Sequence, residues 1–192
     1  MKTYVINNQS ELEQFKDEYG YKVKGNLDVK CSLNIQKRLY VEGSLSIKAG
    51  ESIKAGGSIE AGGYIEAGGP IEAGEYIEAG GYIKAGEYIE AGWYIEAGGY
   101  IEAGDSFGIS AGLQITCKDK LTFGLKCFAG ICTWRKIIDE EKTITCGKFE
   151  GGVVEYGILR ETGLKDSKVK IMWEGKTVEI SRESAKALNL IK

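Results

Sequence analysis

The chain of 192 residues contains no histidine, one proline and no long apolar run. The absence of histidine excludes Ser-His-Asp triads, histidine general bases and histidine-ligated zinc. A single proline argues against a proline-rich linker, and no apolar run approaches the roughly 20 residues that a membrane helix needs. Residues 1–8 lack the apolar core of a secretory signal peptide. We therefore expect a cytoplasmic protein without a membrane segment.

Glycine and a strict repeat dominate the sequence instead. The chain has 28 glycines, roughly twice the usual share. Residues 46–105 form consecutive six-residue units in which the second residue is always Ile, the fourth Ala and the fifth Gly. Because alternate side chains of a strand point to opposite faces, Ile and Ala share one face, and the first and third residues share the other. The fifth residue can adopt positive φ, so we expect the chain to turn a corner there.

Three such sides close one coil of 18 residues, so the sequence predicts a mainly β fold, a three-sided β-helix or β-solenoid. An α-helix does not fit, because an apolar spacing of two does not follow the helical period. Weaker copies of the pattern, such as Leu27 with Val29 and Leu113 with Ile115, extend beyond the strict units. They place the solenoid at residues 23–133, or roughly six coils.

Both ends of the solenoid are expected to be covered, since an open strand edge invites polymerisation. Residues 1–22 are expected to form an N-terminal α/β cap, a strand followed by a short helix in which Ser10 is the N-cap and Glu13 completes a capping box. Residues 134–192 are expected to form a small C-terminal α+β domain. Its predicted elements are strands at 143–148, 153–159, 168–173 and 176–180, the last two joined as a hairpin, and a helix at 181–190.

The outward residues form rows along the predicted coil, because residues 18 apart stack at about 4.8 Å. The third residues of the units give three ladders: Lys48, Glu66, Lys84 and Glu102; Lys54, Glu72 and Glu90; and Glu60, Glu78 and Glu96. Only the last ladder is wholly acidic. It carries no counter-charge, so its like charges repel.

Aromatic residues accompany these ladders. Tyr76 and Tyr94 lie beside the acidic ladder, and Glu75 and Trp93 occupy the corner that leads to it. Tyr and Trp are enriched at interface hot spots. We therefore predict a partner-binding surface of Glu60, Glu75, Tyr76, Glu78, Trp93, Tyr94 and Glu96, and a self-association surface of Tyr64, Tyr82 and Tyr100 that would give a homodimer. Alternatively, the aromatic rows only stabilise the sheet and the carboxylates only keep the protein in solution.

Charge is distributed unevenly along the chain. Residues 46–105 contain 3 Lys and 11 acidic residues, a net charge of −8, whereas the whole chain carries −3. An acidic rod repels nucleic acid, so we expect no direct nucleic-acid binding, but such a rod can imitate nucleic acid to a basic groove. DNA carries one charge per about 1.7 Å and the ladder one per about 4.8 Å, so the imitation would be partial.

No cofactor, metal or catalytic constellation is expected. The five cysteines fit reduced cytosolic thiols, although Cys117, Cys127, Cys132 and Cys146 could also form a zinc site. The sequence contains no phosphate-binding Gly-Lys-Ser/Thr loop. Short corners build no cleft around the carboxylates, so the sequence predicts a protein that is not an enzyme.

Residues 25–45, GNLDVKCSLNIQKRLYVEGSL, resemble the repeated GNL and GSL phrases of the bactofilins, which are polymer-forming β-solenoid proteins. Residues 144–159, ITCGKFEGGVVEYGIL, resemble uncharacterised proteins of phages and bacterial mobile elements. Hexapeptide acyltransferases also form six-residue solenoids. They place the small residue of each unit four positions after the large one and use a catalytic histidine, whereas here Ala follows Ile by two and histidine is absent.

Together these features predict a non-enzymatic β-solenoid that binds a protein partner, such as a nucleic-acid-binding complex. The phage resemblance implies an inhibitor of a nucleic-acid-handling defence system, for example a CRISPR effector, in the cytoplasm of a bacterial host cell. The bactofilin resemblance implies the alternative, a self-assembling structural protein.

Overall fold

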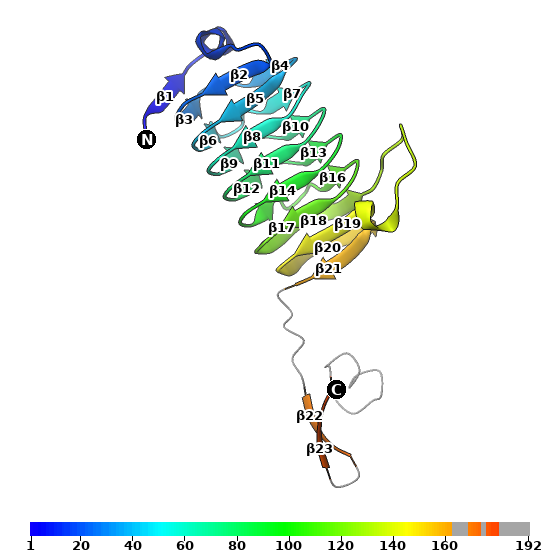
Figure 1. The fold of residues 1–192 in the computed structure, drawn as a ribbon. Coiled ribbons are helices and arrows are strands. Elements are labelled where there is room, and N and C mark those ends of the chain that lie inside the picture. Colours follow the sequence, from blue (N-terminus) through cyan, green and yellow to red (C-terminus); the bar gives the residue numbers. More distant parts are fainter. Residues whose placement is uncertain (163–168, 174–175, 181–192) are drawn as a thin grey trace.

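The repeated Ile and Ala residues line the bore of a three-sided β-solenoid in a computed structural model that describes residues 1–162, 169–173 and 176–180. Each coil contributes one strand to each of three faces, and every strand pairs in parallel with its neighbours in the adjacent coils. Figure 1 shows the coils stacked into an elongated rod with the N-terminal strand at one end. The predicted fold class is confirmed.

The first and second faces belong to one continuous sheet, because the long strand β18 (Lys120–Ala129) passes from one face to the other. The first face consists of β1 (Thr3–Ile6), β3 (Asn26–Val29), β6 (Leu45–Ile47), β9 (Ile65–Ala67), β12 (Ile83–Ala85), β15 (Ile101–Glu102) and the first half of β18. The second face consists of β4 (Leu33–Ile35), β7 (Ile53–Ala55), β10 (Ile71–Ala73), β13 (Ile89–Ala91), β16 (Ile109–Ala111) and the second half of β18.

The third face is a separate sheet of eight strands, one from each coil. Its strands are β2 (Gly20–Val23), β5 (Arg38–Val41), β8 (Ile59–Ala61), β11 (Ile77–Ala79), β14 (Ile95–Ala97), β17 (Ile115–Cys117), β19 (Thr143–Cys146) and β21 (Ile158–Glu161). The solenoid therefore holds more coils than the six expected from the sequence.

The predicted advance of 18 residues per coil holds through the strict repeats, where Ile77 pairs with both Ile59 and Ile95. At two places a coil takes 20 residues, as the pairing of Leu33 with Ile53 and of Ile89 with Ile109 shows. The first longer corner contains Gly50 at φ +80°. Each extra pair of residues widens one corner and leaves the inward positions of the following strands unchanged.

The corner glycines of the repeats are required for a different reason than predicted. Gly80 and Gly98 do not have positive φ. Instead, each lies directly over a carbonyl of the preceding coil: a Cβ on Gly80 would be 2.3 Å from Gly62 O, and one on Gly98 would be 2.0 Å from Gly80 O. Close approach between coils, and not a left-handed backbone, excludes side chains from this position.

The N-terminal cap is built on a 3-10 helix, η1 (Gln9–Phe15), and not on an α-helix. The predicted capping box is wrong: Asn8 precedes the helix without a side-chain cap, and Glu13 pairs with Lys16 at 2.8 Å. Leu12 is fully buried against the first coil, so η1 still covers this end of the bore. The chain then enters β2 at Gly20.

The sheets extend beyond both expected boundaries of the solenoid. At the N-terminus β1 pairs in parallel with β3, so the strand of the cap belongs to the first face. At the C-terminus β19 pairs with β17, β21 with β19, and β20 (Lys148–Tyr156) with β18. An insertion at 130–142, which includes the 3-10 helix η2 (Asp139–Lys142), interrupts the period and hides this continuation in the sequence.

The predicted hairpin is present: β22 (Val169–Trp173) and β23 (Lys176–Ile180) pair antiparallel. The expected turn at 174–175 and the expected helix at 181–190 lie outside the described residues. The segment 143–161, assigned from the sequence to an α+β domain, forms the last strands of the solenoid instead.

Candidate partner-binding face

Three carboxylates lie in register on the third face. Glu60, Glu78 and Glu96 are the middle residues of β8, β11 and β14, and Glu78 pairs with the other two. The same row holds uncharged Tyr40 and Thr116 in the next strand on either side. Since neighbouring strands lie about 4.8 Å apart, the carboxylates span roughly 10 Å. This acidic stripe (Glu60, Glu78 and Glu96) has the predicted register and is confined to three coils.

Tyrosine rings cover one side of the acidic stripe. The rings of Tyr76 and Tyr94 stack with centroids 4.8 Å apart and planes 4° apart. Each hydroxyl reaches the preceding coil: Tyr76 Oη donates a hydrogen bond to Glu60 at 2.8 Å, and Tyr94 Oη donates one to Glu78 at 3.3 Å. The tyrosines therefore connect neighbouring coils, a structural role that the sequence analysis did not identify.

The three carboxylates differ in exposure and in the hydrogen bonds that they accept. Glu60 also accepts a hydrogen bond from Ser58 Oγ at 3.0 Å and is half-buried. Glu96 is exposed, and no hydrogen bond or ion pair reaches it from any residue in 1–162. Glu78 is exposed and, within the described part of the chain, accepts only the long bond from Tyr94. Glu78 and Glu96 are therefore the carboxylates most available to a partner.

Trp93 stands at the corner between the second and third faces. Its N–H donates to Glu75 O at 2.8 Å, so Glu75 and Trp93 are consecutive residues of one corner column. The indole is 39% exposed, and its centroid lies 6.5 Å from that of Tyr76. The structure thus brings the predicted residues Glu75, Tyr76 and Trp93 together at the edge of the acidic stripe.

Trp134 is a member of this surface that the sequence analysis missed. It lies in the 130–142 insertion, is 58% exposed, and its ring centroid is 6.3 Å from that of Trp93. The guanidinium carbon of Arg135 lies 5.2 Å from the Trp134 ring centroid. Arg135 also donates two hydrogen bonds to Glu141, at 2.8 and 2.7 Å, which lower the pKa of Glu141 to about 2. This ion pair holds the insertion in shape beside Trp93.

The tyrosines of the first face form a longer stack. Tyr82 lies between Tyr64 and Tyr100, with centroid separations of 4.8 and 4.7 Å and planes 2° and 3° apart. Beside them Lys84 pairs with Glu102 at 2.9 Å. The predicted stack is confirmed in geometry, and its role in self-association remains a prediction.

One member of the first-face ladder was wrongly assigned. Ser46, and not Lys48, pairs with Glu66. The reason is that Leu45 takes the first inward position of its strand and Ile47 the second, so the unit beginning at residue 46 is out of phase with the others. Lys48 consequently lies in the first longer corner.

The tyrosine–glutamate contacts predict loss of stability in alkali. The hydrogen bond to Glu72, followed by burial, raises the pKa of Tyr88 from 10 to about 12. A raised tyrosine pKa adds stability that is complete below pH 10 and is lost as the pH rises through 12. The same direction of shift occurs at four further tyrosines of the repeats, Tyr76, Tyr82, Tyr94 and Tyr100, and at Tyr21 near the N-terminus.

Thermal unfolding followed from neutral pH to pH 12 measures this effect. We expect the melting temperature of the wild type to fall more steeply above pH 10 than that of Tyr88→Phe, which has no phenol to ionise there. Tyrosinate absorbance recorded in parallel reports the ionisation itself. Identical alkaline slopes for the two proteins would contradict a coil-connecting role for this hydroxyl.

All five cysteines lie in the part of the chain that the structure describes. No group of three or more Cys, Asp or Glu side chains there is arranged to hold a metal ion, and all five cysteines are free. Burial raises the pKa of Cys117 and Cys127 to about 12 and that of Cys146 to about 11. These three thiols stay protonated at neutral pH and fill the bore.

No helix in the described residues is both long and apolar enough to span a bilayer. Comparison of the chain with protein-family models, with curated proteins and with solved structures finds no match.

Proposed function

We propose that this protein is a non-enzymatic β-solenoid that binds a basic protein partner through the acidic stripe and the adjacent tryptophans. The proposal rests on two observations: Glu78 and Glu96 are exposed on the third face, and Trp93 and Trp134 form a partly exposed aromatic pair at the corner that leads into this face. Indole rings supply contact area typical of interface hot spots. Exposed carboxylates attract a basic partner and orient it.

The partner class that fits this surface is a protein whose basic groove normally holds nucleic acid. The acidic stripe presents three carboxylates in a straight row over roughly 10 Å. This spacing is wider than that of DNA phosphates, so the stripe would occupy part of such a groove. In this proposal the protein inhibits a nucleic-acid-handling defence complex of the CRISPR kind in a bacterial cytoplasm.

Binding explains the surface better than catalysis does. Glu78 and Glu96 are open to water on a sheet face. Acid–base catalysis by carboxylates relies on a concave site that excludes water and positions a substrate. Recognition of a partner requires neither a water-excluding site nor a positioned substrate, and a surface with exposed carboxylates and indole rings is sufficient for it.

Reversing the charges of the acidic stripe is the direct test. We expect the triple change Glu78→Lys, Glu96→Lys and Trp93→Ala to weaken inhibition of DNA binding by a purified CRISPR effector about 100-fold, because the reversed charges repel a basic partner and the lost indole removes contact area. Competition by fluorescence anisotropy with labelled DNA measures it.

A first-face variant with Glu66→Lys, Glu102→Lys and Tyr64→Ala is the matched control and should inhibit like the wild type. Equal inhibition by the two triple variants would show that the third face is not the site. If the wild type does not inhibit the effector, the proposal that the partner is a nucleic-acid-binding defence complex is wrong.

Self-assembly of the bactofilin kind is the second candidate function. One observation favours it: β20 and β21 end their sheets, and no further strand pairs with either among the described residues. Unpaired edges of parallel sheets can add another chain. Light scattering at increasing concentration separates the candidates, because filament growth supports assembly, whereas a constant mass supports a discrete binding protein.

A further inference from the structure

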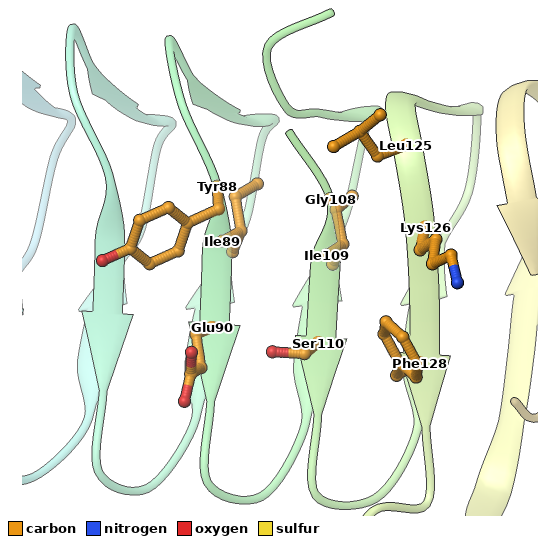
Figure 2. Close-up of a pocket in the computed structure, with 9 residues that line it drawn as sticks. All are labelled: Tyr88, Ile89, Glu90, Gly108, Ile109, Ser110, Leu125, Lys126 and Phe128. Atoms are coloured by element: carbon orange, nitrogen blue, oxygen red, sulfur yellow. The ribbon is translucent and has the colours of Figure 1, made fainter. Parts of the chain in front are cut away.

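The second face carries a groove of about 280 Å³ that lies away from the acidic stripe. Figure 2 shows its floor at Gly108 and Ser110 of the strand region around β16, with Tyr88 and Glu90 on one side and Phe128 on the other. Leu125 adds an apolar wall and is 56% exposed. The groove is one strand wide, because the two small residues stand between rows of larger side chains.

The floor of the groove is the place where the tyrosine pattern of the solenoid is interrupted. On the first and third faces outward tyrosine rings stack from coil to coil, as in the 4.8 Å stack of Tyr76 and Tyr94, and these rows end where Gln114 follows Tyr94 and Lys120 follows Tyr100. On the second face the residue that follows Tyr88 is Gly108, since Ile89 pairs with Ile109. Phe107 contacts Tyr88 only at a tilt, with centroids 6.5 Å apart.

The chain cannot supply the missing ring itself. A Cβ on Gly108 would lie 2.2 Å from the carbonyl oxygen of Lys126, so no side chain is tolerated at this position. The exposed flank of Tyr88 is therefore open to a ring from another molecule.

A carboxylate without a donor accompanies the missing ring. In the strict repeats a tyrosine hydroxyl from the following coil donates to the glutamate of the coil before it, as Tyr88 does to Glu72. The same bonds join Tyr76 to Glu60, Tyr82 to Glu66 and Tyr94 to Glu78. Glu90 would receive its bond from a tyrosine at position 108. It is exposed, and among the described residues no hydrogen bond or ion pair reaches it.

We propose that this groove binds the tyrosyl side chain of a partner protein, with the phenol ring beside Tyr88 and the hydroxyl donated to Glu90. The ring would continue the aromatic row, and Leu125 and Phe128 would cover its far side. Lys126, at the rim, is already paired with Glu155 at 2.9 Å, so it leaves the charge of Glu90 uncompensated. A tyrosine supplies both the planar ring and the donor. This site is independent of the acidic stripe, which lies on another face.

Titration of isotope-labelled protein with N-acetyl-tyrosinamide tests the proposal. Amide shifts should concentrate at Ser110 and Leu125, and N-acetyl-phenylalaninamide, which lacks the hydroxyl, should bind about tenfold more weakly, as expected for loss of a hydrogen bond to a charged group. Glu90→Gln keeps the shape of the groove and should reduce this preference. Ser110→Tyr should fill the groove and abolish binding of both probes.

Glu96→Gln is the matched control, because Glu96 holds the same position of its unit on the third face and should leave the titration unchanged. Equal affinity for the two probes would overturn the proposal. Tighter binding of N-acetyl-argininamide would also overturn it, because the site would then select a cation and not a phenol. Absence of shifts at the groove amides up to the solubility limit of the probe would do the same.

Discussion

Gly80→Ala should lower the free energy of unfolding by about 3 kcal/mol, the upper range for overpacking a tightly packed position. The new Cβ would lie 2.3 Å from Gly62 O, and that oxygen belongs to the backbone of the neighbouring coil and cannot turn away. Relief requires the two coils to separate locally, which weakens the hydrogen bond from Gly80 N–H to Ala61 O, now 2.9 Å. Urea denaturation followed by circular dichroism measures the loss.

Gly81→Ala is the control for this prediction, because it makes the same chemical change one residue later. A Cβ there would lie 3.3 Å from the nearest atoms of Gly63, and the equivalent corner position carries Glu75 and Trp93 in other units. We expect a change within about 1 kcal/mol, since alanine also restricts the unfolded chain. Equal losses from the two variants would show that coil-to-coil approach does not explain the corner glycines.

Ile77→Ala should lower the free energy of unfolding by about 4 kcal/mol, at least as much as Gly80→Ala does. Ile77 is 0% exposed and lies in register between Ile59 and Ile95, so truncation leaves a cavity in the middle of the bore. The neighbouring isoleucines are held by their own strands and cannot move in to fill it. The midpoint of urea denaturation reports the effect.

Graded variants make the core prediction specific. Ile77→Val removes a single methyl group and should cost about 1 kcal/mol. Glu96→Ala removes an exposed side chain that has no partner among residues 1–162, and should change stability by less than about 0.5 kcal/mol. A loss for Ile77→Ala no larger than that for Glu96→Ala would mean that the isoleucines do not carry the core.

The three-sided fold could be predicted from the sequence because one rule places nearly every side chain of the repeats. Ile and Ala, two residues apart, must share a face, and six residues per side close the coil at 18. The register of Glu60, Glu78 and Glu96 follows from that period alone, which is why the acidic stripe could be located without coordinates.

The features that escaped prediction depend on contacts between coils, which periodicity does not report. The hydroxyl of Tyr76 bonds the carboxylate of Glu60 because the ring leans across a coil boundary. Trp134 reaches Trp93 because the 130–142 insertion emerges from the corner column that contains Trp93, a geometry invisible before the coils are stacked.

The last coils were missed for a related reason. Ile144 and Cys146 continue the inward rows of Ile115 and Cys117, but 29 residues separate the paired isoleucines. The Ile-Thr-Cys triplet occurs at both places and was the available signal. The N-terminal helix was misjudged because Ser10 and Glu13 fit a capping box by type, whereas Glu11 makes the bond to Asn7 N–H, at 2.9 Å.

The two 20-residue coils have a consequence for how the chain finds its native pairing. Between them the units are so alike that a strand displaced by one whole coil would meet the same isoleucines, alanines and glycines, at little cost in energy. The wider turns at either end of this uniform stretch, together with the Leu- and Val-lined coils before it, are not interchangeable with anything else. They fix the register in which the coils pair. The irregular parts of the molecule therefore determine which of several near-equivalent alignments becomes the folded protein.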